Sequence, residues 1–309
     1  MSVVPSMAHV IINRDSGAAD KSALTRQIDT EFASHGWKVE FVPVGRDNLH
    51  SRIRQAVGQA PGAIVVAGGD GTINAVGTAC AEVKRTLGIL PTGTFNYVAR
   101  NLRVPGDMAQ AVAVIVQGQV RHLSVGEING RIFLHNAGFG LYTRMLEQRE
   151  QDVRRFGRSR LVAFMSGIRC LLRSHPLFGV ELVADGRLER RLTTTLFFGC
   201  NVLQLEELSL RAADCLRQQK LAVLSLKLRS RWEVAVAAFA GLIGRLDCVK
   251  TTETFCASAL RVQTRRRRLK VVMDGELVHL RPPLDIRFRP EALTVFAPPL
   301  GTDELAAMR

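Results

Sequence analysis

A glycine-rich segment that contains one carboxylate is the clearest candidate for chemistry in this sequence. Gly68-Gly69-Asp70-Gly71-Thr72 follows the apolar run 63–67 and leads into a segment, Thr72–Glu82, with helical periodicity. Glycines let backbone N–H groups approach an anion closely, and the N-terminus of a helix attracts negative charge. Asp70 can hold Mg²⁺ or a ligand hydroxyl. The segment therefore predicts a phosphate cradle, and the alternative is an ordinary turn in which Asp70 is the helix N-cap.

The spacing of these glycines disfavours two common nucleotide-binding motifs. No lysine follows the segment, as the pattern G-x-x-x-x-G-K-[ST] requires, and the glycines do not match G-x-G-x-x-G. A P-loop and a Rossmann dinucleotide site therefore both lose support.

A second polar loop follows the next predicted strand, residues 87–90. It is Leu90-Pro91-Thr92-Gly93-Thr94-Phe95-Asn96 and leads into another predicted helix. Adjacent strands of a parallel sheet present their C-terminal loops to one crevice, so Thr94 and Asn96 are candidates to hydrogen-bond the same ligand. Helix capping is the alternative for both. A third polar loop, Asn13–Gly17, ends the first predicted strand, and an ordinary turn is its simpler interpretation.

A further candidate carboxylate lies near the C-terminus. The segment Met273-Asp274-Gly275-Glu276 is flanked by apolar residues on both sides. Asp-Gly in such a place predicts a two-residue hairpin turn. Glu276 can act as a general base, or it is an ordinary exposed strand residue.

The order of the predicted elements indicates two kinds of domain. Through residue 118, apolar strands alternate with amphipathic helices, which is typical of a parallel sheet covered on both faces. After residue 119, three hairpin signals appear, at Asn129-Gly130, Asp185-Gly186 and Asp274-Gly275. Two longer helices are predicted within this second part, at Leu141–Arg173 and Trp232–Leu246. The predicted fold class is α/β, with an N-terminal domain built on a parallel-type sheet and a C-terminal, mostly antiparallel β domain.

Composition and charge restrict the class of protein and its partners. Hydrophobic residues make up 47% of the chain, which excludes a disordered basic tail protein. The net charge is +14, and +11 of it belongs to residues 126–309, including the run Arg265–Arg268. A field of this sign favours anionic partners. Nucleic acid is not expected among them, because no recognised binding module accompanies the charge and aromatics total only 6%.

The cysteines and the N-terminus indicate a cytoplasmic protein. The six cysteines form no C-x-x-C pair, so we expect free thiols rather than a zinc site. The first residues lack the basic region and cleavage site of a secretory signal. The apolar run Val234–Gly244 is too short for a membrane-spanning helix, and charged residues flank it on both sides.

The three motifs GGDGT, LPTGTFN and MDGE, in this order, resemble those of the bacterial diacylglycerol-kinase-like lipid kinases, whose catalytic domain is shared with diacylglycerol, sphingosine and ceramide kinases. The resemblance covers roughly residues 8–298. It implies a nucleotide-binding α/β domain, residues 1–125, with the tail from about 290 to 309 packed back on it, and a β-sandwich lipid domain, residues 126–289. It also implies that ATP binds in a cleft and that its γ-phosphoryl group passes to a hydroxyl of a diacylglycerol-like lipid.

The same resemblance assigns roles to individual residues. Glu276 matches the general base, and Asp70 is implied as a catalytic residue and as a ligand of Mg²⁺. The residues implied to surround ATP are Asn13, Ser16, Gly17, Gly68, Gly69, Asp70, Gly71, Thr72, Asn74, Gly93, Thr94 and Asn96. The implied cofactors are ATP and Mg²⁺. The implied partner is a lipid substrate at an anionic membrane surface, with peripheral association at the inner membrane face, and a homodimer is left open.

Three positions depart from the family's pattern. Tyr97, Ser124 and Gln218 stand where many members have Asp. Because Mg²⁺ prefers charged oxygen ligands, the resemblance does not extend to a full metal network or to a structural Mg²⁺ site at Gln218. Two alternatives to a lipid kinase therefore stay open: a nucleotide- or lipid-binding pseudokinase, and an NAD-kinase-like enzyme, since that related superfamily also has a GGDG loop.

Overall fold

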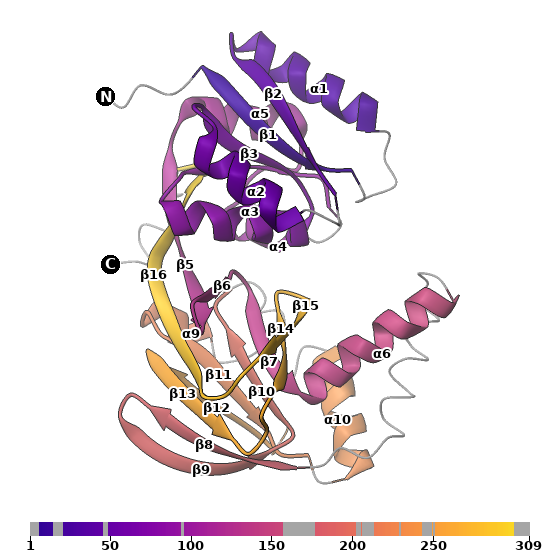
Figure 1. Cartoon of the computed structure of the whole chain (residues 1–309), viewed down its shortest axis with the longest axis vertical. Helices are drawn as coiled ribbons and strands as arrows, with labels where there is room; N and C mark the ends of the chain where they lie inside the picture. Colours follow the sequence, from indigo (N-terminus) through magenta and orange to yellow (C-terminus); the bar gives the residue numbers. More distant parts are fainter. Residues whose placement is uncertain are drawn as a thin grey trace. The chain divides into compact units, whose positions relative to one another are not determined.

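Figure 1 shows the computed structural model, which divides into two compact units. Unit 1 consists of Met1–Ser124 and Pro290–Arg309, and unit 2 of Val125–Arg289. Two strands, β5 (Val120–Ile128) and β16 (Leu284–Phe296), include residues of both units. The structure describes residues 6–14, 21–45, 49–93, 96–156, 177–201, 205, 213–228, 230–242, 249 and 251–299.

Unit 1 is built on a parallel sheet. Its strands lie in the order β2-β1-β3-β4, each neighbouring pair is parallel, and β16 joins β4 where Val295 lies opposite Leu87. All six residues of β3 are buried, because the helix pairs α1–α5 and α2–α3 cover the two faces of the sheet. The predicted parallel sheet is therefore confirmed. The elements are β1 (Met7–Asn13), α1 (Lys21–Ser34), β2 (Lys38–Val44), α2 (Leu49–Gln59), β3 (Ala63–Gly68), α3 (Asp70–Val83), β4 (Leu87–Pro91), α4 (Tyr97–Asn101) and α5 (Met108–Gln117).

Unit 2 contains two antiparallel sheets that share one core. One sheet has the order β12-β11-β10-β7-β14-β15, and the other contains β13, β8 and β9 with the parts of β16 and β5 that belong to this unit, and β6. Buried side chains from both sheets, such as Phe139 of β7 and Leu182 of β8, pack in one hydrophobic cluster. The predicted, mostly antiparallel second domain is confirmed. The remaining strands are β6 (Arg131–Phe133), β7 (Asn136–Gly140), β8 (Phe178–Ala184), β9 (Arg187–Thr193), β10 (Thr195–Gly199), β11 (Leu221–Leu226), β12 (Thr252–Ala257), β13 (Ala259–Thr264), β14 (Leu269–Met273) and β15 (Glu276–Leu280).

The three predicted hairpins all form, as β5–β6, β8–β9 and β14–β15. Both turn residues have positive φ in each of them: 49° and 79° at Asn129-Gly130, 44° and 85° at Asp185-Gly186, and 48° and 86° at Asp274-Gly275. Asn, Asp and Gly adopt this conformation at the lowest cost, and it gives the type I′ twist that matches the flanking strands.

The helices of unit 2 are shorter in the described part of the chain than the sequence predicts. They are α6 (Leu141–Phe156), α9 (Ala213–Arg217) and α10 (Arg231–Leu242). The rest of the predicted helix Leu141–Arg173 and the end of Trp232–Leu246 lie outside the described residues. Within the described ranges, no helix is long and apolar enough to cross a membrane.

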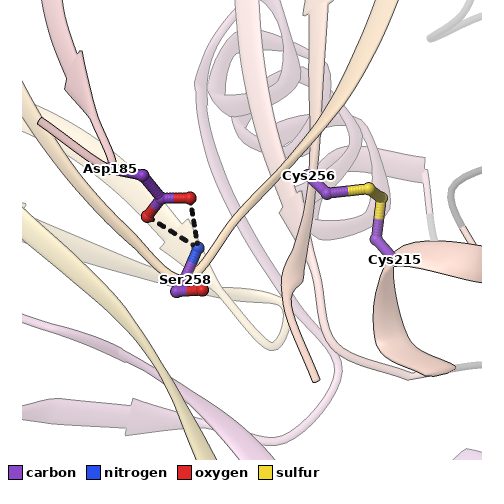
Figure 2. The surroundings of a disulfide bond; sticks show 4 residues. All are labelled: Asp185, Cys215, Cys256 and Ser258. Atoms are coloured by element: carbon purple, nitrogen blue, oxygen red, sulfur yellow. Dashed lines mark hydrogen bonds between the residues drawn. A yellow bond between two sulfur atoms is a disulfide. The ribbon is translucent and has the colours of Figure 1, made fainter. Parts of the chain in front are cut away.

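The expectation that all cysteines are free thiols is wrong for one pair. Cys215 of α9 and Cys256 of β12 form a disulfide, with their Cα atoms 5.2 Å apart (Figure 2). Two residues beyond Cys256, the N–H of Ser258 donates to the Asp185 carboxylate at 3.1 Å, so the β12–β13 connection is held twice. Cys80 and Cys200 are buried free thiols, and burial raises the pKa of Cys80 to about 12. The remaining two cysteines, 170 and 248, lie outside the described residues.

Removing this disulfide is expected to destabilise the protein. The bond closes a loop between residues 41 positions apart, for which loop-closure entropy predicts a loss of about 4 kcal/mol in the free energy of unfolding. Urea unfolding of the double variant Cys215→Ser/Cys256→Ser beside the oxidised wild type measures the loss. Dithiothreitol should destabilise the wild type and leave the double variant unchanged. An equal effect of dithiothreitol on both proteins would contradict the bond's role.

Candidate active site

Two loops of unit 1 lie side by side at the C-terminal ends of β3 and β4. The strands pair up to Gly68 and Pro91, and the N–H of Thr92 donates to the carbonyl oxygen of Gly68 at 3.1 Å. Beyond this point the backbones of Gly69 and Gly93 touch, because a Cβ built on Gly93 would lie 2.4 Å from the Cα of Gly69. Only glycine leaves room for this contact.

The carboxylate of Asp70 connects the first loop with the second. Gly69, not Asp70, is the N-cap of α3, so the alternative in which Asp70 caps this helix is wrong. Asp70 is instead the first residue of α3, and its Oδ1 accepts a hydrogen bond of 2.7 Å from the N–H of Tyr97. Tyr97 begins α4 directly after the second loop. The carboxylate is half-buried at the place where the two loops meet.

Asn96 closes the second loop with its side chain. Its Oδ1 accepts a hydrogen bond of 3.0 Å from the N–H of Gly93, and its Nδ2 donates to the Gly93 carbonyl oxygen at 2.9 Å. Asn96 is the N-cap of α4 by position, with φ at 50°, but its side chain makes no capping hydrogen bond. Simple capping is therefore the wrong alternative for Asn96. Thr94 lies outside the described residues, as do Ser16 and Gly17, while Asn13 ends β1 and is partly buried.

The first turn of α3 leaves open space beside the glycine-rich loop. A Cβ built on Gly71, which is exposed, would meet no atom within 4 Å. The first N–H groups of a helix have no intrahelical acceptor and so can bind an anion there. Thr72 is buried against Gly68, whose added Cβ would lie 2.8 Å from the Thr72 Cβ. One turn further along, the buried Oδ1 of Asn74 has no hydrogen-bond partner among the residues that the structure describes.

In unit 2, Glu276 lies beside a hairpin turn that is firmly held. Glu276 is the first residue of β15, pairs with Met273 of β14 and is exposed. Asp274 anchors the turn, because its carboxylate accepts hydrogen bonds from the N–H groups of Leu134 and His135, both at 2.7 Å, and of Asn136 at 3.0 Å. Leu134 and His135 connect β6 with β7, and Asn136 is the first residue of β7. The backbone of Glu276 is therefore fixed although its side chain faces solvent.

Sequence reasoning missed this role of Asp274. The hairpin turn alone explains why an Asp-Gly pair stands here, so the sequence suggests no second role for the Asp274 side chain. The three N–H groups that donate to it lie about 140 positions away in the chain. Burial raises the pKa of the Asp274 carboxyl above its ordinary value, while nearby His135 and the three N–H donors act in the opposite direction.

Truncating Asp274 is expected to destabilise unit 2. In Asp274→Ala three N–H donors lose their acceptor, which predicts a loss of about 2–4 kcal/mol in the free energy of unfolding. Asp274→Asn keeps an acceptor oxygen and should lose less. Urea unfolding of the three proteins gives the order, and an Ala variant as stable as the wild type would contradict the anchoring role.

The raised pKa of Asp274 also predicts how this comparison changes with pH. The folded protein holds the proton more tightly than the unfolded chain, so the carboxyl stabilises the fold fully below its ordinary pKa of 3.8. This contribution to the free energy of unfolding is lost as the pH rises through the pKa that the carboxyl has in the folded protein. The free energy of unfolding of the wild type, relative to Asp274→Asn, should therefore fall as the pH rises from about 4.

The three positions that depart from the family's pattern have other roles in this structure. Tyr97 supplies the N–H that binds Asp70, and the Ser124 hydroxyl accepts a hydrogen bond of 3.3 Å from the N–H of Glu291. Gln218 is exposed in the turn after α9, three residues from the disulfide-bonded Cys215. Among the residues that the structure describes, no group of three His, Cys, Asp or Glu side chains is placed to hold a metal ion.

Comparisons with known proteins show that this chain is similar to diacylglycerol kinases. The model of the diacylglycerol kinase catalytic domain matches residues 7–128. The diacylglycerol kinase of Bacillus subtilis is 30% identical over 186 residues, which cover 59% of this chain and 60% of that protein. The diacylglycerol kinase of Staphylococcus saprophyticus is 38% identical over 84 residues, which cover 26% of this chain and 28% of that protein. The chain thus matches about 60% or less of the length of these relatives.

The fold itself is shared over a longer stretch. A crystal structure of a diacylglycerol kinase from Bacillus anthracis superimposes with a TM-score of 0.63 at 16% identity, covering 96% of this chain and 98% of that one. At this identity the likeness concerns the fold alone. Residues 7–128 match the model of the diacylglycerol kinase catalytic domain, and the comparisons together support a relationship of this chain to the bacterial diacylglycerol-kinase-like lipid kinases.

Proposed function

We propose that this protein is an ATP-dependent lipid kinase that phosphorylates a hydroxyl of a diacylglycerol-like lipid. The observation that carries the proposal is the contact between the two loops of unit 1, Gly69 against Gly93, with Asp70 hydrogen-bonded across them. This arrangement lies within the matched domain and leaves open space at the first turn of α3. A turn that only connects a strand to a helix does not require this backbone contact. A polyphosphate does, because its oxygens bind backbone N–H groups at close range.

The proposal assigns ATP to the loops of unit 1. The backbone N–H groups at the start of α3 bind phosphate oxygens, and the glycines keep side chains away from them. The residues that fit a magnesium ion are Asp70 and Asn74, which are four positions apart on α3 and therefore on the same face, and the unpaired Oδ1 of Asn74 is a neutral oxygen ligand. When bound, Mg²⁺ neutralises charge on the phosphates.

Glu276 is assigned as the general base. Its carboxylate accepts the proton of the lipid hydroxyl while the hydroxyl oxygen forms a bond to the γ-phosphorus, and the bond between that phosphorus and the oxygen of ADP breaks. The products are a phosphorylated lipid and ADP. The Asp274 anchor holds the strand that begins with Glu276, which supports a fixed position for this carboxylate.

The lipid substrate is proposed to lie in an anionic membrane surface at the cytoplasmic face. The excess of basic residues in the second half of the chain supports this, because each Lys or Arg near such a surface adds about 1 kcal/mol of attraction.

A homodimer is the proposed assembly. It is supported by the edge strand β9, on which Leu188 and Leu192 are exposed. Light scattering of the purified protein tests the dimer.

One assay tests the proposed activity. The purified protein is incubated with γ-labelled ATP, Mg²⁺ and mixed micelles that contain diacylglycerol, ceramide or sphingosine, and separately with NAD. Label in a lipid is the expected result. Label in NAD would support the NAD-kinase-like alternative instead, and ATP binding without transfer to any acceptor would support a pseudokinase.

Replacing Asp70 by Asn is expected to weaken the dependence on Mg²⁺ without unfolding the loops. The Asn oxygen can still accept the N–H of Tyr97, but the charged ligand is lost, so the Mg²⁺ concentration for half-maximal activity should rise by about tenfold. Titration of activity with Mg²⁺ at fixed ATP measures it. Asp29→Asn, on the exposed face of α1, is the matched control. An unchanged Mg²⁺ titration would remove Asp70 as the metal ligand.

A further inference from the structure

A positively charged cavity of about 370 Å³ lies in unit 2, where β7 ends and α6 begins. Its wall combines two kinds of side chain. The apolar part includes Phe139, Leu141, Phe178 and Leu269. The cationic or titratable part consists of Arg144, Arg266, Arg268, Lys270 and His279, and Glu147 is the single carboxylate among the lining residues that the structure describes.

The one carboxylate among the described residues of this wall is already engaged. Glu147 forms an ion pair with Lys270. Within the described part of the chain, neither the guanidinium of Arg266 nor that of Arg268 contacts a carboxylate. The Arg266 guanidinium lies over the ring of Phe178, 5.8 Å from its centroid. Among the described residues that line it, the cavity therefore carries more cationic than anionic side chains.

We propose that this cavity binds the phosphate group of an anionic phospholipid. Arginine presents a planar set of donors that matches phosphate oxygens, and two such groups on one wall repel each other unless an anion lies between them. Of the apolar side chains of the same wall, Phe178 is partly exposed, and its ring suits the first carbons of an acyl chain. A free phosphate has the charge but uses none of this apolar surface, so the combination favours a lipid headgroup.

The cavity is distinct from the place where Glu276 acts. In the β14–β15 hairpin, His279 pairs with Lys270 near the open end, whereas Glu276 pairs with Met273 beside the turn. Three residues along a strand correspond to about 10 Å, and an odd separation puts the two side chains on opposite faces of the sheet. A lipid held by the cavity is therefore not the acceptor at Glu276. It is a second lipid contact, and it does not depend on phosphoryl transfer.

The arginine run 265–268 provides a matched pair of variants. Arg266 and Arg268 line the cavity. Arg265 lines an adjacent hollow, which shares Phe178 and Arg266 with the cavity, and Arg267 lines neither; all four arginines are exposed. Arg266→Gln/Arg268→Gln and Arg265→Gln/Arg267→Gln remove the same charge from the same loop. General attraction to a charged surface would respond equally to both changes, whereas a specific cavity responds to one.

The experiment is sedimentation with phosphatidylcholine vesicles that contain phosphatidylglycerol, without ATP. The cavity variant is expected to bind about tenfold more weakly than the wild type, and the control variant to lose less than about threefold. Equal losses in the two variants would overturn the proposal. Circular dichroism and thermal unfolding establish that both are folded.

Calorimetry distinguishes the two possible sources of phosphate. Short-chain phosphatidylglycerol should bind the wild type more tightly than inorganic phosphate does, and the cavity variant should lose this preference. Equal affinity of the wild type for both ligands would overturn the lipid assignment. The Glu276→Gln variant is expected to lose phosphoryl transfer but should still bind vesicles. The test of lipid binding is therefore independent of the test of the proposed kinase activity.

Discussion

The Glu276→Gln variant is expected to phosphorylate lipid about 10² to 10⁴ times more slowly than the wild type, with an unchanged Kd for ATP. Glutamine has nearly the same shape but accepts no proton, so the hydroxyl must lose its proton without a base in the transition state. Binding of ATP precedes this event and does not involve it. Initial rates with labelled ATP and a calorimetric Kd measure the two quantities.

The position of Glu276 makes the variant a clean test. Its side chain is exposed and its strand is anchored through Asp274, so the substitution should change the free energy of unfolding by less than about 0.5 kcal/mol. Glu150→Gln, at an exposed site on α6, serves as the matched control and should keep full activity. A Glu276→Gln enzyme with the wild-type kcat would end the assignment of this residue as the base.

The Gly93→Ala variant is expected to lose about 10²-fold in kcat/KM. The new Cβ would lie 2.4 Å from the Cα of Gly69 and 2.7 Å from the Oδ1 of Asn96, so the two loops have to move apart. The first contact is with backbone, which no side-chain rotation relieves. A displacement of about 1 Å at a site that positions phosphates is enough for a loss of this size. Steady-state kinetics with varied ATP measures it.

Stability separates this effect from simple unfolding. Overpacking predicts a loss of about 1–3 kcal/mol for Gly93→Ala, which leaves a folded protein at 25 °C if the wild type has ordinary stability. Gly58→Ala is the control, because Gly58 is exposed on α2 and its added Cβ would meet nothing within 4 Å. That variant should be slightly more stable, with normal kinetics. Normal kcat/KM in a folded Gly93→Ala protein would show that the loop contact is not needed.

Local sequence signals predicted the framework of this protein well. Strands of the parallel sheet are continuous apolar runs because both faces are covered, and β3 is buried along its whole length as expected. The three Asn-Gly and Asp-Gly pairs predicted their hairpins because few residues adopt two successive positive φ values. The order of the strands and helices then followed from the short connections between successive elements.

Features that depend on distant parts of the chain could not be predicted in this way. The partners of the Asp274 carboxylate lie near residue 135, and no periodicity connects the two segments. Cys215 and Cys256 stand in no recognised spacing, so their pairing depends on α9 lying against β12. The contact of Gly69 with Gly93 was implied only by the adjacency of two strands. Each of these features is set by tertiary packing rather than by local preference.

The division of unit 1 into two sequence segments affects how the protein is made. Pro290–Phe296 supplies the last part of β16, and Val295 pairs with Leu87 of the parallel sheet of unit 1. The ribosome therefore synthesises all of unit 2 before the edge of β4 is covered. Until then the nascent first unit exposes a strand edge, which is a site for mispairing between chains. A stop codon before residue 290 would therefore remove part of the first unit, including the Val295 that pairs with Leu87.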